Sequence, residues 1–399
     1  MPDDKCGDFV PAMRILHTSD WHLGKLFEGH HLTEDQAYVL DDFVALARDT
    51  KPDIVIIAGD LYDRSVPPHD AVSLFSDVLN RLVRELKLPT LAIAGNHDSS
   101  ERIDFGSELL KDAGLVMTGN PLCSGVLTLE DTHGAVDFVP IPFATPEALR
   151  SALRASNQDA DVQGFGPAMQ RQVEEALQRS PNPRRVAIAH AFVTGGHTSE
   201  SERDLQVGGT GDVAAQVFDP FLYTALGHLH RPQWIDKGRR GEAIRYSGSL
   251  LPYSFSEIDQ PKSVTLVELG ANGVEHTEYP TLRAKRQLRK LTGTFDEILQ
   301  ASREDTQRDD YIWAEIQDTG LVLQAMPRLR ELYPNAVKLT RSVSTLPSLG
   351  TNQRNIRQSS PRDIVHDFWR DIGEEEALTE AQTTFLDQAI ERARGEKDA

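Results

Sequence analysis

The chain has 399 residues, of which 39% are hydrophobic and 26% are charged, and its formal net charge is −19. This length and composition allow two or three globular domains with a sizeable core. The lack of any apolar run near the ~20 residues of a membrane span argues against a membrane protein, and the presence of only two cysteines, Cys6 and Cys123, argues against a disulfide framework.

Residues 1–12 precede the first apolar run, and we predict that they form a disordered leader. They are polar and acidic, and they lack the basic and apolar segments of a secretory signal. We therefore expect a cytoplasmic protein.

Between residues 13 and 280, apolar runs of β type alternate with helical stretches. The runs are Met13–His17, Asp53–Ala58, Pro89–Ala94, Val186–Ala189 and Tyr223–Leu226. Apolar residues at helical spacing predict helices over Glu34–Thr50 and Ala71–Leu86, and later strands are predicted over Ala243–Ser247 and Ser263–Leu269. The pattern indicates a layered α/β fold, in which a β-sandwich is flanked by helices.

The rest of the chain divides into three predicted segments. Residues 281–345 show a strand–helix–strand–helix–strand pattern, which predicts a smaller α/β domain. Residues 346–360 are rich in Ser, Pro, Asn and Gly and are predicted to be a linker. Residues 361–399 are predicted to form two helices, of which the first, Pro361–Asp371, has an apolar stripe that either docks on a partner or packs on its own domain. The stripe consists of Ile364, Val365, Phe368 and Trp369.

Short clusters of His, Asp and Asn residues follow the five β-type runs. In chain order they are Asp20-Trp21-His22, Gly59-Asp60 with Asp63, Gly95-Asn96-His97-Asp98, His190, and Gly227-His228-Leu229-His230. A single Asp-x-His pair or a lone histidine at a strand end is more often structural than a ligand, but five clusters at five strand ends are hard to produce by chance. Strand ends that converge on one edge of a sheet can gather these side chains around two metal ions, which favours phosphate-ester hydrolysis.

Two ions held about 3.5–4 Å apart need a ligand that bridges them, and Asp60 is the natural bridge at the end of a buried-looking strand. Residues two apart on a strand share a face, so Asp20 and His22 are expected to bind one ion, with Asn96 and His190 completing the other. His228 and His230 can be divided between the two ions. The predicted metal ligands are Asp20, His22, Asp60, Asn96, His190, His228 and His230.

The predicted cage stays net positive, because two carboxylates offset only part of the charge of two divalent ions, and this suits an anionic phosphodiester. Mixed nitrogen and oxygen ligation fits Mn, Fe or Zn better than Mg or Ca. His97 directly follows Asn96 and is expected to point away from the ions, toward the substrate, where it protonates the leaving group. The Asp63 carboxylate is expected to orient its other ring nitrogen, so the predicted catalytic residues are His97 and Asp63. The glycines of the clusters are expected to allow sharp turns; they are Gly59, Gly95 and Gly227.

The distribution of charge bears on the substrate. Residues 281–345 carry 11 Lys and Arg against 9 Asp and Glu, residues 346–399 carry 7 against 11, and residues 1–280 therefore hold −17 of the −19 total. Such an acidic chain would hold a long phosphate backbone weakly on its own. Either the substrate is small, or a partner supplies much of the positive surface.

The order of these motifs resembles the calcineurin-like metallophosphoesterase superfamily, whose ligands carry over one by one to the seven predicted here. Longer strings resemble the bacterial SbcD family of nuclease subunits, and this resemblance runs from Met13 to about residue 345. The strings are MRILHTSDWHLGK (13–25), GDLYDRSVP (59–67), GNHDSSER (95–102) and GHLHRP (227–232).

The resemblance implies a Mn²⁺-dependent DNA nuclease, acting as an exonuclease on duplex ends and as an endonuclease on single strands and hairpins. It implies work in DNA repair, recombination and replication with an SbcC-type coiled-coil ATPase, as a homodimer within a heterotetramer. Residues 281–345 would be a DNA-capping domain, and residues 361–399 would dock on the ATPase. The candidate phosphate contacts, with a solvated strand edge as the alternative, are Arg283, Lys285, Arg286, Arg289 and Lys290.

Two other functional classes remain open from the residues alone. A standalone metallophosphodiesterase or phosphatase for small or protein-bound phosphates is favoured by the acidic surface, whereas the cap-like domain and the apolar tail favour the nuclease. The third class is a non-catalytic scaffold that keeps the fold for binding.

Overall fold

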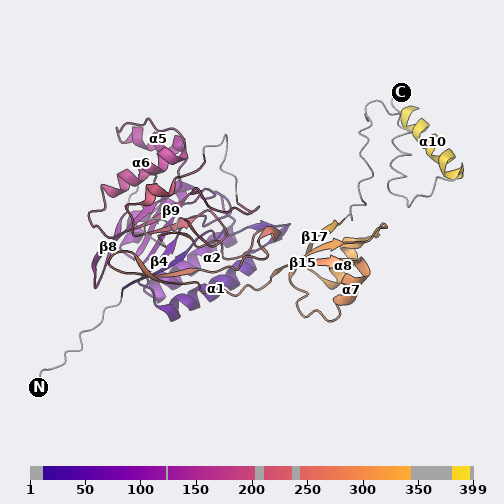
Figure 1. The fold of residues 1–399 in the computed structure, drawn as a ribbon, viewed down its shortest axis with the longest axis horizontal. Helices are drawn as coiled ribbons and strands as arrows, with labels where there is room; N and C mark the ends of the chain where they lie inside the picture. Colours follow the sequence, from indigo (N-terminus) through magenta and orange to yellow (C-terminus); the bar gives the residue numbers. More distant parts are fainter. Residues whose placement is uncertain (1–11, 123–124, 203–210, 236–242, 343–379, 396–399) are drawn as a thin grey trace, which may run out of the picture. The chain divides into compact units, whose positions relative to one another are not determined.

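The structure is a computed structural model that describes residues 12–122, 125–202, 211–235, 243–342 and 380–395. Two six-stranded sheets pack against each other (Figure 1). Helices α1 (Thr33–Thr50) and α2 (His69–Leu79) lie on one outer side, and α5 (Pro146–Ala155) and α6 (Phe165–Leu177) lie on the other. This confirms the predicted layered α/β sandwich.

The first sheet has the strand order β14-β13-β1-β4-β5-β6, in which β1, β4, β5 and β6 run parallel. Its strands are β1 (Met13–Thr18), β4 (Ile54–Ile57), β5 (Thr90–Ile93), β6 (Leu115–Thr118), β13 (Thr265–Leu269) and β14 (Val274–Glu278). Its parallel strands are connected through α1 (Thr33–Thr50), α2 (His69–Leu79), α3 (Ser100–Asp104) and α4 (Ser107–Lys111). A small hairpin of β2 (Leu26–Phe27) and β3 (His30–His31) precedes α1.

The second sheet has the order β11-β12-β10-β9-β8-β7, with β8, β9, β10 and β12 parallel. Its strands are β7 (Leu127–Asp131), β8 (Gly134–Ile141), β9 (Arg185–His190), β10 (Tyr223–Gly227), β11 (Gln233–Ile235) and β12 (Ile244–Tyr246). Helices α5 (Pro146–Ala155) and α6 (Phe165–Leu177) form the crossover between β8 and β9. A 3₁₀ turn over Ala215–Phe218 precedes β10, and a second over Phe255–Glu257 follows β12.

The core follows from strand alternation. Ile54 and Ile56 of β4 pack in one cluster with Ile188 of the second sheet. Val55 and Ile57 point to the opposite face and join the cluster that contains the buried faces of α1 and α2. Because both faces of the sheet are covered, its parallel strands appear in the sequence as unbroken apolar runs.

The second predicted helix differs from the structure. Instead of one helix over Ala71–Leu86, α2 ends at Leu79 and continues as a π-helical turn over Asn80–Glu85. Within α2 the buried side chains are those of Ala71, Phe75 and Val78, whereas Val72 is 44% exposed.

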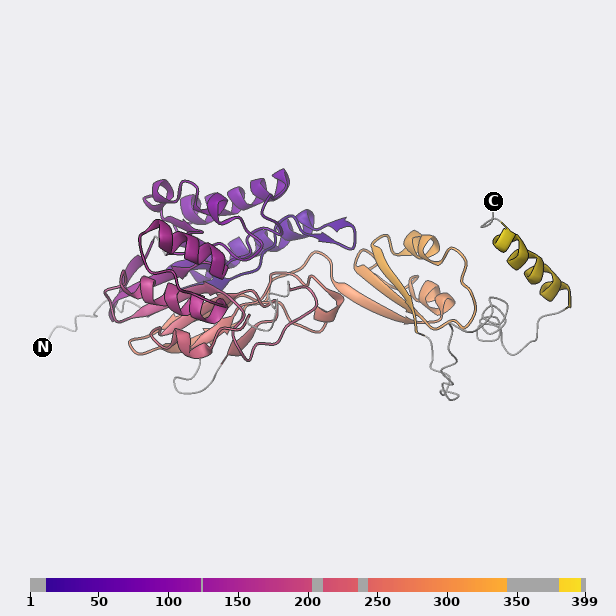
Figure 2. The same cartoon turned by 90° about the horizontal axis from the view of Figure 1, so that it is seen from above.

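A three-stranded parallel sheet follows β14. Its elements are β15 (Leu288–Gly293), α7 (Phe295–Ala301), β16 (Tyr311–Ile316), α8 (Ala325–Leu332) and β17 (Ala336–Arg341). Both helices cover one face of this sheet (Figure 2). The buried Ile312 and Ala314 pack in one cluster with Phe295 and Leu329 of the two helices. On the other face, Leu288, Tyr311 and Trp313 pack with the helix-side core of the first sheet.

Residues 343–399 form a separate unit, of which the structure describes only α10 (Glu380–Gly395). The predicted leader up to residue 11, the linker 346–360 and the apolar stripe of Ile364, Val365, Phe368 and Trp369 lie outside the described residues. Among the helices that are described, none is long and apolar enough to cross a membrane.

The five basic residues that are candidate phosphate contacts form ion pairs within the chain. Each of them meets at least one carboxylate at an ion-pair distance. The pairs are Arg283 with Asp42, Lys285 with Glu34, Arg286 with Glu34 and Asp35, Arg289 with Asp305 and Asp310, and Lys290 with Glu315. These pairs largely offset the positive charge of the segment, and contact of the five residues with phosphates stays a prediction.

Asp35 is the most deeply buried carboxylate of this set, and we expect Asp35→Asn to destabilise the protein. Its carboxylate accepts hydrogen bonds from Arg286 at 2.8 Å and from the Tyr311 hydroxyl at 2.9 Å, and it is 2% exposed. Loss of a charged acceptor there should lower the free energy of unfolding by about 1–3 kcal/mol, measured by urea denaturation. Glu34→Gln is the matched control, because Glu34 also pairs with Arg286 but is exposed. Equal effects of the two substitutions would contradict the prediction.

The buried His17 should make the stability of the folded protein sensitive to acid. It is fully buried on β1, 2.8 Å from the Tyr223 hydroxyl, and burial together with nearby Arg245 lowers the pKa of its imidazole to about 3. The folded state therefore keeps His17 neutral while the unfolded chain protonates it near its ordinary pKa of 6.5. Its contribution to stability is complete above that value and is lost as the pH falls toward the folded pKa.

We expect His17→Gln to flatten the acid dependence of stability. Between about pH 6 and pH 4, metal-free wild type should lose roughly 2 kcal/mol more unfolding free energy than the variant, because each pH unit costs about 1.4 kcal/mol per proton. Urea denaturation at several pH values measures this difference. Parallel pH profiles for the two proteins would show that His17 is not held neutral.

Candidate metal centre

Every predicted cluster follows the carboxyl end of a parallel strand. Asp20 and His22 follow β1, Asp60 follows β4, and Asn96 follows β5. His190 is the last residue of β9, and His228 and His230 follow β10. Because the two sheets place these five ends at one edge of the sandwich, side chains far apart in the sequence meet there.

The loops after the strands, rather than the strands themselves, aim these side chains. β1 ends at Thr18, so Asp20 and His22 do not share a strand face, which corrects the argument from strand periodicity. Both have positive φ, 53° and 45°, as do Asp60 at 49° and His228 at 107°. Such conformations are strained for non-glycine residues and occur where a site requires a particular side-chain direction.

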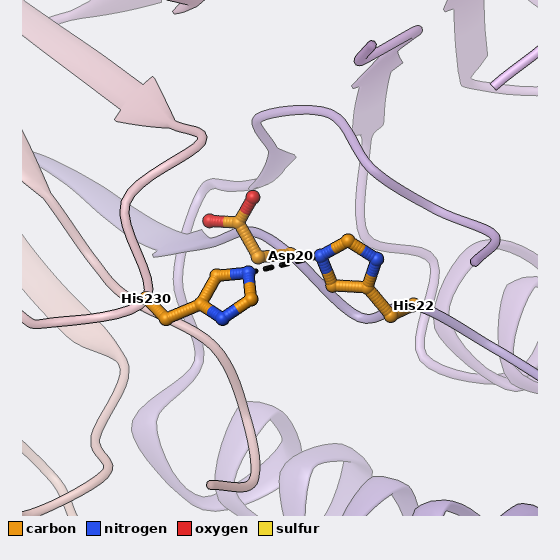
Figure 3. A group of neighbouring side chains, drawn as sticks. All are labelled: Asp20, His22 and His230. Carbon is orange, nitrogen blue, oxygen red and sulfur yellow. Dashed lines mark hydrogen bonds between the residues drawn. The ribbon is translucent and has the colours of Figure 1, made fainter. Parts of the chain in front are cut away.

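One half of the site consists of Asp20, His22 and His230 (Figure 3). One potential ligand atom from each lies within 4.8 Å of the others, and the Nε2 atoms of His22 and His230 are 3.0 Å apart. Donor atoms bound to one ion at ~2.1 Å lie ~3–4 Å from each other, so this spacing suits a shared cation. All three residues are buried.

The other half is built around Asp60. Its Oδ2 lies 3.5 Å from His190 Nε2 and 3.6 Å from His22 Nε2, so this carboxylate faces both halves of the site. The Asn96 side-chain oxygen lies 2.9 Å from His190 Nε2 and 3.0 Å from His228 Nδ1. His230 therefore lies in the first half, and His228 in the second.

The arrangement of acceptors indicates where a cation fits. His190 Nδ1 is 2.9 Å from the main-chain oxygen of Ala58, which can only accept, so Nδ1 carries the proton of the neutral ring. The lone pair on Nε2 then faces the oxygens of Asp60 and Asn96. Three acceptors that face one another need a positive charge between them, which a divalent ion supplies.

The electrostatics of the buried groups point the same way. Burial opposes a charge on His190, but Asp60 overcomes this and raises the pKa of the imidazole to about 9. Burial also opposes a charge on Asp60, but His190, His22 and His97 hold the pKa of its carboxyl well below the usual range. Burial lowers the pKa of His228 to about 3 and that of His22 well below its usual value. The site thus combines an ionised carboxylate with neutral His22 and His228, and a cation would replace the extra proton on His190.

His97 is placed differently from the prediction. Its Nδ1 is 2.8 Å from the main-chain oxygen of Asp63, not from the Asp63 carboxylate, which instead pairs with Lys25 at 2.8 Å and lies 3.6 Å from His22 Nδ1. The expected carboxylate–histidine pair is therefore wrong for His97. Its Nε2 lies 4.0 Å from Asp60 Oδ2, at the border of the site rather than turned away from it.

Close approach explains two of the glycines better than turning does. A Cβ on Gly95 would lie 2.2 Å from Asp60 Oδ1, and one on Gly227 would lie 2.0 Å from the Ala58 oxygen. Neither has a positive φ, whereas Gly59 does, at 91°. Side chains at positions 95 and 227 would displace the loops that carry Asp60 and His228.

Several supporting residues were not predicted from the sequence. The Asp98 carboxylate accepts the N–H groups of Leu61 and Tyr62 at 3.0 and 2.9 Å and that of Gly95 at 2.8 Å, and so joins the loops after β4 and β5. Ser201 and Glu257 contact His230 from distant segments. Asp98 belongs to the predicted cluster that contains His97, although no role was predicted for it, whereas nothing near Glu257 in the sequence marks it.

The family model for calcineurin-like phosphoesterases matches residues 13–232, more than half of the 399 residues. The chain belongs to the calcineurin-like phosphoesterase family. A second family model, for the SbcD C-terminal domain and described as the type 5 capsule protein repressor C-terminal domain, matches residues 284–372 of this phosphoesterase. The two matches together support an SbcD-type nuclease subunit.

Solved structures with similar folds are distant from this phosphoesterase. The protein TT1561 of Thermus thermophilus is 15% identical, with a TM-score of 0.40, over 67% of this chain and 99% of that one. A dimetal phosphatase from Danio rerio is 13% identical, with a TM-score of 0.40, over 68% of this chain and 100% of that one. Similarity this low gives no information about the activity of the phosphoesterase.

Proposed function

We propose that this phosphoesterase is a two-metal DNA nuclease that hydrolyses phosphodiester bonds at duplex ends, in single strands and in hairpins. The observation that carries the proposal is the convergence of His22, His97 and His190 on the Asp60 carboxylate, in a chain that also matches the SbcD C-terminal domain. Membership of its family makes the chain a metal-dependent phosphoester hydrolase. The proposal adds that its substrate is DNA.

The residues divide into two ligand groups that share Asp60. Asp20, His22 and His230 would hold one ion, and Asn96, His190 and His228 the other. Mixed oxygen and nitrogen donors fit Mn²⁺ well, and we propose Mn²⁺ as the metal. When bound, two such ions polarise the phosphate and supply a nucleophile at neutral pH.

His97 would act on the leaving group. Because the Asp63 main-chain oxygen accepts the Nδ1 proton, the ring presents Nε2 at the border of the site. As an imidazolium, His97 would donate its Nε2 proton to the departing alkoxide, and it would stabilise the charge that develops there. Asp63 would contribute through its main-chain oxygen to His97 and through its carboxylate to Lys25 and His22.

The charge distribution supports a partner. The chain carries −19, and the basic side chains of residues 283–290 are already paired with carboxylates. A long DNA substrate would therefore need positive surface from another protein. We propose an SbcC-type coiled-coil ATPase as that protein, with the phosphoesterase as a homodimer within a heterotetramer that serves DNA repair and recombination.

Digestion of linear duplex and hairpin DNA with Mn²⁺, with and without the ATPase, tests this function. We expect DNA cleavage that the partner enhances, with a preference for DNA over bis(p-nitrophenyl) phosphate. If the small ester is cleaved far better than DNA in both conditions, the chain is instead a standalone phosphodiesterase, the reading that its acidic charge favours. Metal binding without turnover on any phosphoester would indicate a scaffold.

A further inference from the structure

A cluster of charged and polar residues lies behind His230, outside the set of predicted ligands. It contains Glu257, whose side chain is fully buried on the 3₁₀ turn Phe255–Glu257, together with Lys262, Ser201 and Glu202. These residues come from segments on both sides of the β10–β12 region of the chain. A buried carboxylate is costly unless it is paired, so its place beside a predicted metal ligand calls for a physical reason.

The hydrogen bonds of the cluster determine which nitrogen of His230 carries the proton. Glu257 Oε1 can only accept, so the Ser201 hydroxyl donates to it. The Ser201 oxygen, 2.5 Å from His230 Nδ1, is then the acceptor for the Nδ1 proton. The neutral ring is left with its lone pair on Nε2, the atom that lies 3.0 Å from His22 Nε2 in the metal site.

The main chain of His230 is held by the same cluster. Glu202 Oε1 accepts the His230 N–H at 2.8 Å, and Lys262 Nζ donates to the His230 oxygen at 2.8 Å. Lys262 also pairs with Glu257 Oε2 at 2.5 Å. The Glu257 carboxylate therefore holds the Lys262 ammonium that binds the His230 carbonyl. His230 is thus fixed at its ring, its N–H and its carbonyl.

Within the described part of the chain, the Nδ1 side of His190 has no comparable ionic support. There, His190 Nδ1 donates to the neutral main-chain oxygen of Ala58. By contrast, Glu257 Oε1 lies 3.6 Å from His230 Nδ1. A carboxylate behind an imidazole makes its far nitrogen a more basic ligand than a carbonyl does.

We propose that Glu257 is a positioning residue that fixes the tautomer of His230 and strengthens cation binding by the Asp20–His22–His230 half of the site. The inference rests on the proposed two-ion function of the site. It implies that the two halves differ in affinity and that Glu257 acts on one of them.

Calorimetric titration of the metal-free chain with Mn²⁺ tests this inference on Glu257→Gln. Wild type should bind two ions, and the variant should bind one of them ~10–100-fold more weakly while the other affinity is unchanged. Electron paramagnetic resonance at one equivalent and at two equivalents of Mn²⁺ provides a second readout that is independent of activity. Glu175→Gln is the matched control, because Glu175 is also buried, at 3% exposed, and pairs with Arg171 at 2.8 Å on α6.

The outcomes separate the inference from the function on which it rests. Two wild-type affinities that are unchanged in Glu257→Gln would overturn the positioning role alone, whereas wild type that binds fewer than two ions would overturn the proposed function. If Glu257→Gln does not fold, as judged by circular dichroism, Ser201→Ala decides the matter. It interrupts the path to His230 but keeps the Glu257–Lys262 pair, and it should weaken the same ion; unchanged binding would refute the proposal.

Discussion

Replacing His97 with alanine should reduce the turnover of DNA by about 10²–10⁴-fold while leaving two Mn²⁺ bound. The reason is geometric, since His97 Nδ1 is engaged by the Asp63 oxygen at 2.8 Å and Nε2 alone faces the site. Steady-state cleavage of duplex DNA together with elemental analysis of the loaded protein measures both quantities. His133→Ala, a change of the same kind on the surface, should alter neither.

Two substrates with different leaving groups test the role of His97 more specifically. The alkoxide that leaves DNA needs a proton, whereas p-nitrophenolate leaves without one, so His97→Ala should impair DNA cleavage far more than hydrolysis of bis(p-nitrophenyl) phosphate. Equal losses on both substrates would argue against leaving-group protonation. Loss of an ion would instead make His97 a ligand, an arrangement that its proximity to Asp60 and His22 permits.

Replacing Asp60 with asparagine should have the largest effect on metal content. Its Oδ2 lies within 3.5–4.0 Å of the Nε2 atoms of His190, His22 and His97, so the substitution removes the charge that both halves share. We expect Mn²⁺ stoichiometry to fall from two to one or none, and phosphodiester turnover to fall to background. Calorimetric titration and activity assays measure these changes.

Stability gives an independent readout of the Asp60 change. An ion at a free concentration of about 100 times its Kd stabilises the folded state by about 2.7 kcal/mol, so Mn²⁺ should raise the Tm of wild type clearly and that of Asp60→Asn much less. Asp137→Asn is the matched control, because Asp137 is equally buried but is bound to Thr128 and Ser180. It should lower stability without changing the Mn²⁺ response. A full two-ion response in Asp60→Asn would rule out the bridge.

The strand ends were predictable from the sequence. Parallel strands covered on both faces must be apolar throughout, and polar residues can resume only where the strand reaches the sheet edge. The transition from Ile54–Ile57 to Gly59-Asp60, or from Tyr223–Gly227 to His228, therefore marks both a strand and a site. The apolar pattern had already indicated this position at the strand ends. The motifs that resemble the family then added the chemistry expected there.

The type of helical turn and the directions of the side chains were harder to predict from the sequence. The π-helical turn over Asn80–Glu85 replaces the end of the predicted α-helix, and sequence periodicity assumes one constant turn. Asp20 and His22 are aimed by positive φ values in a loop, whereas the strand rule that placed them together does not apply beyond Thr18. Loop conformation depends on hydrogen bonds such as His22 N–H to the Asp60 oxygen, which join distant segments.

The sequence alone determined which chemical groups could reach one edge of the sandwich, because strand patterning and residue type are local properties. Only the tertiary structure showed that Arg286 is paired with Asp35 and that Glu257 stands behind His230. Each of these contacts joins residues that lie far apart along the chain. No local rule of spacing encodes them, since they arise only when the folded chain brings these segments together.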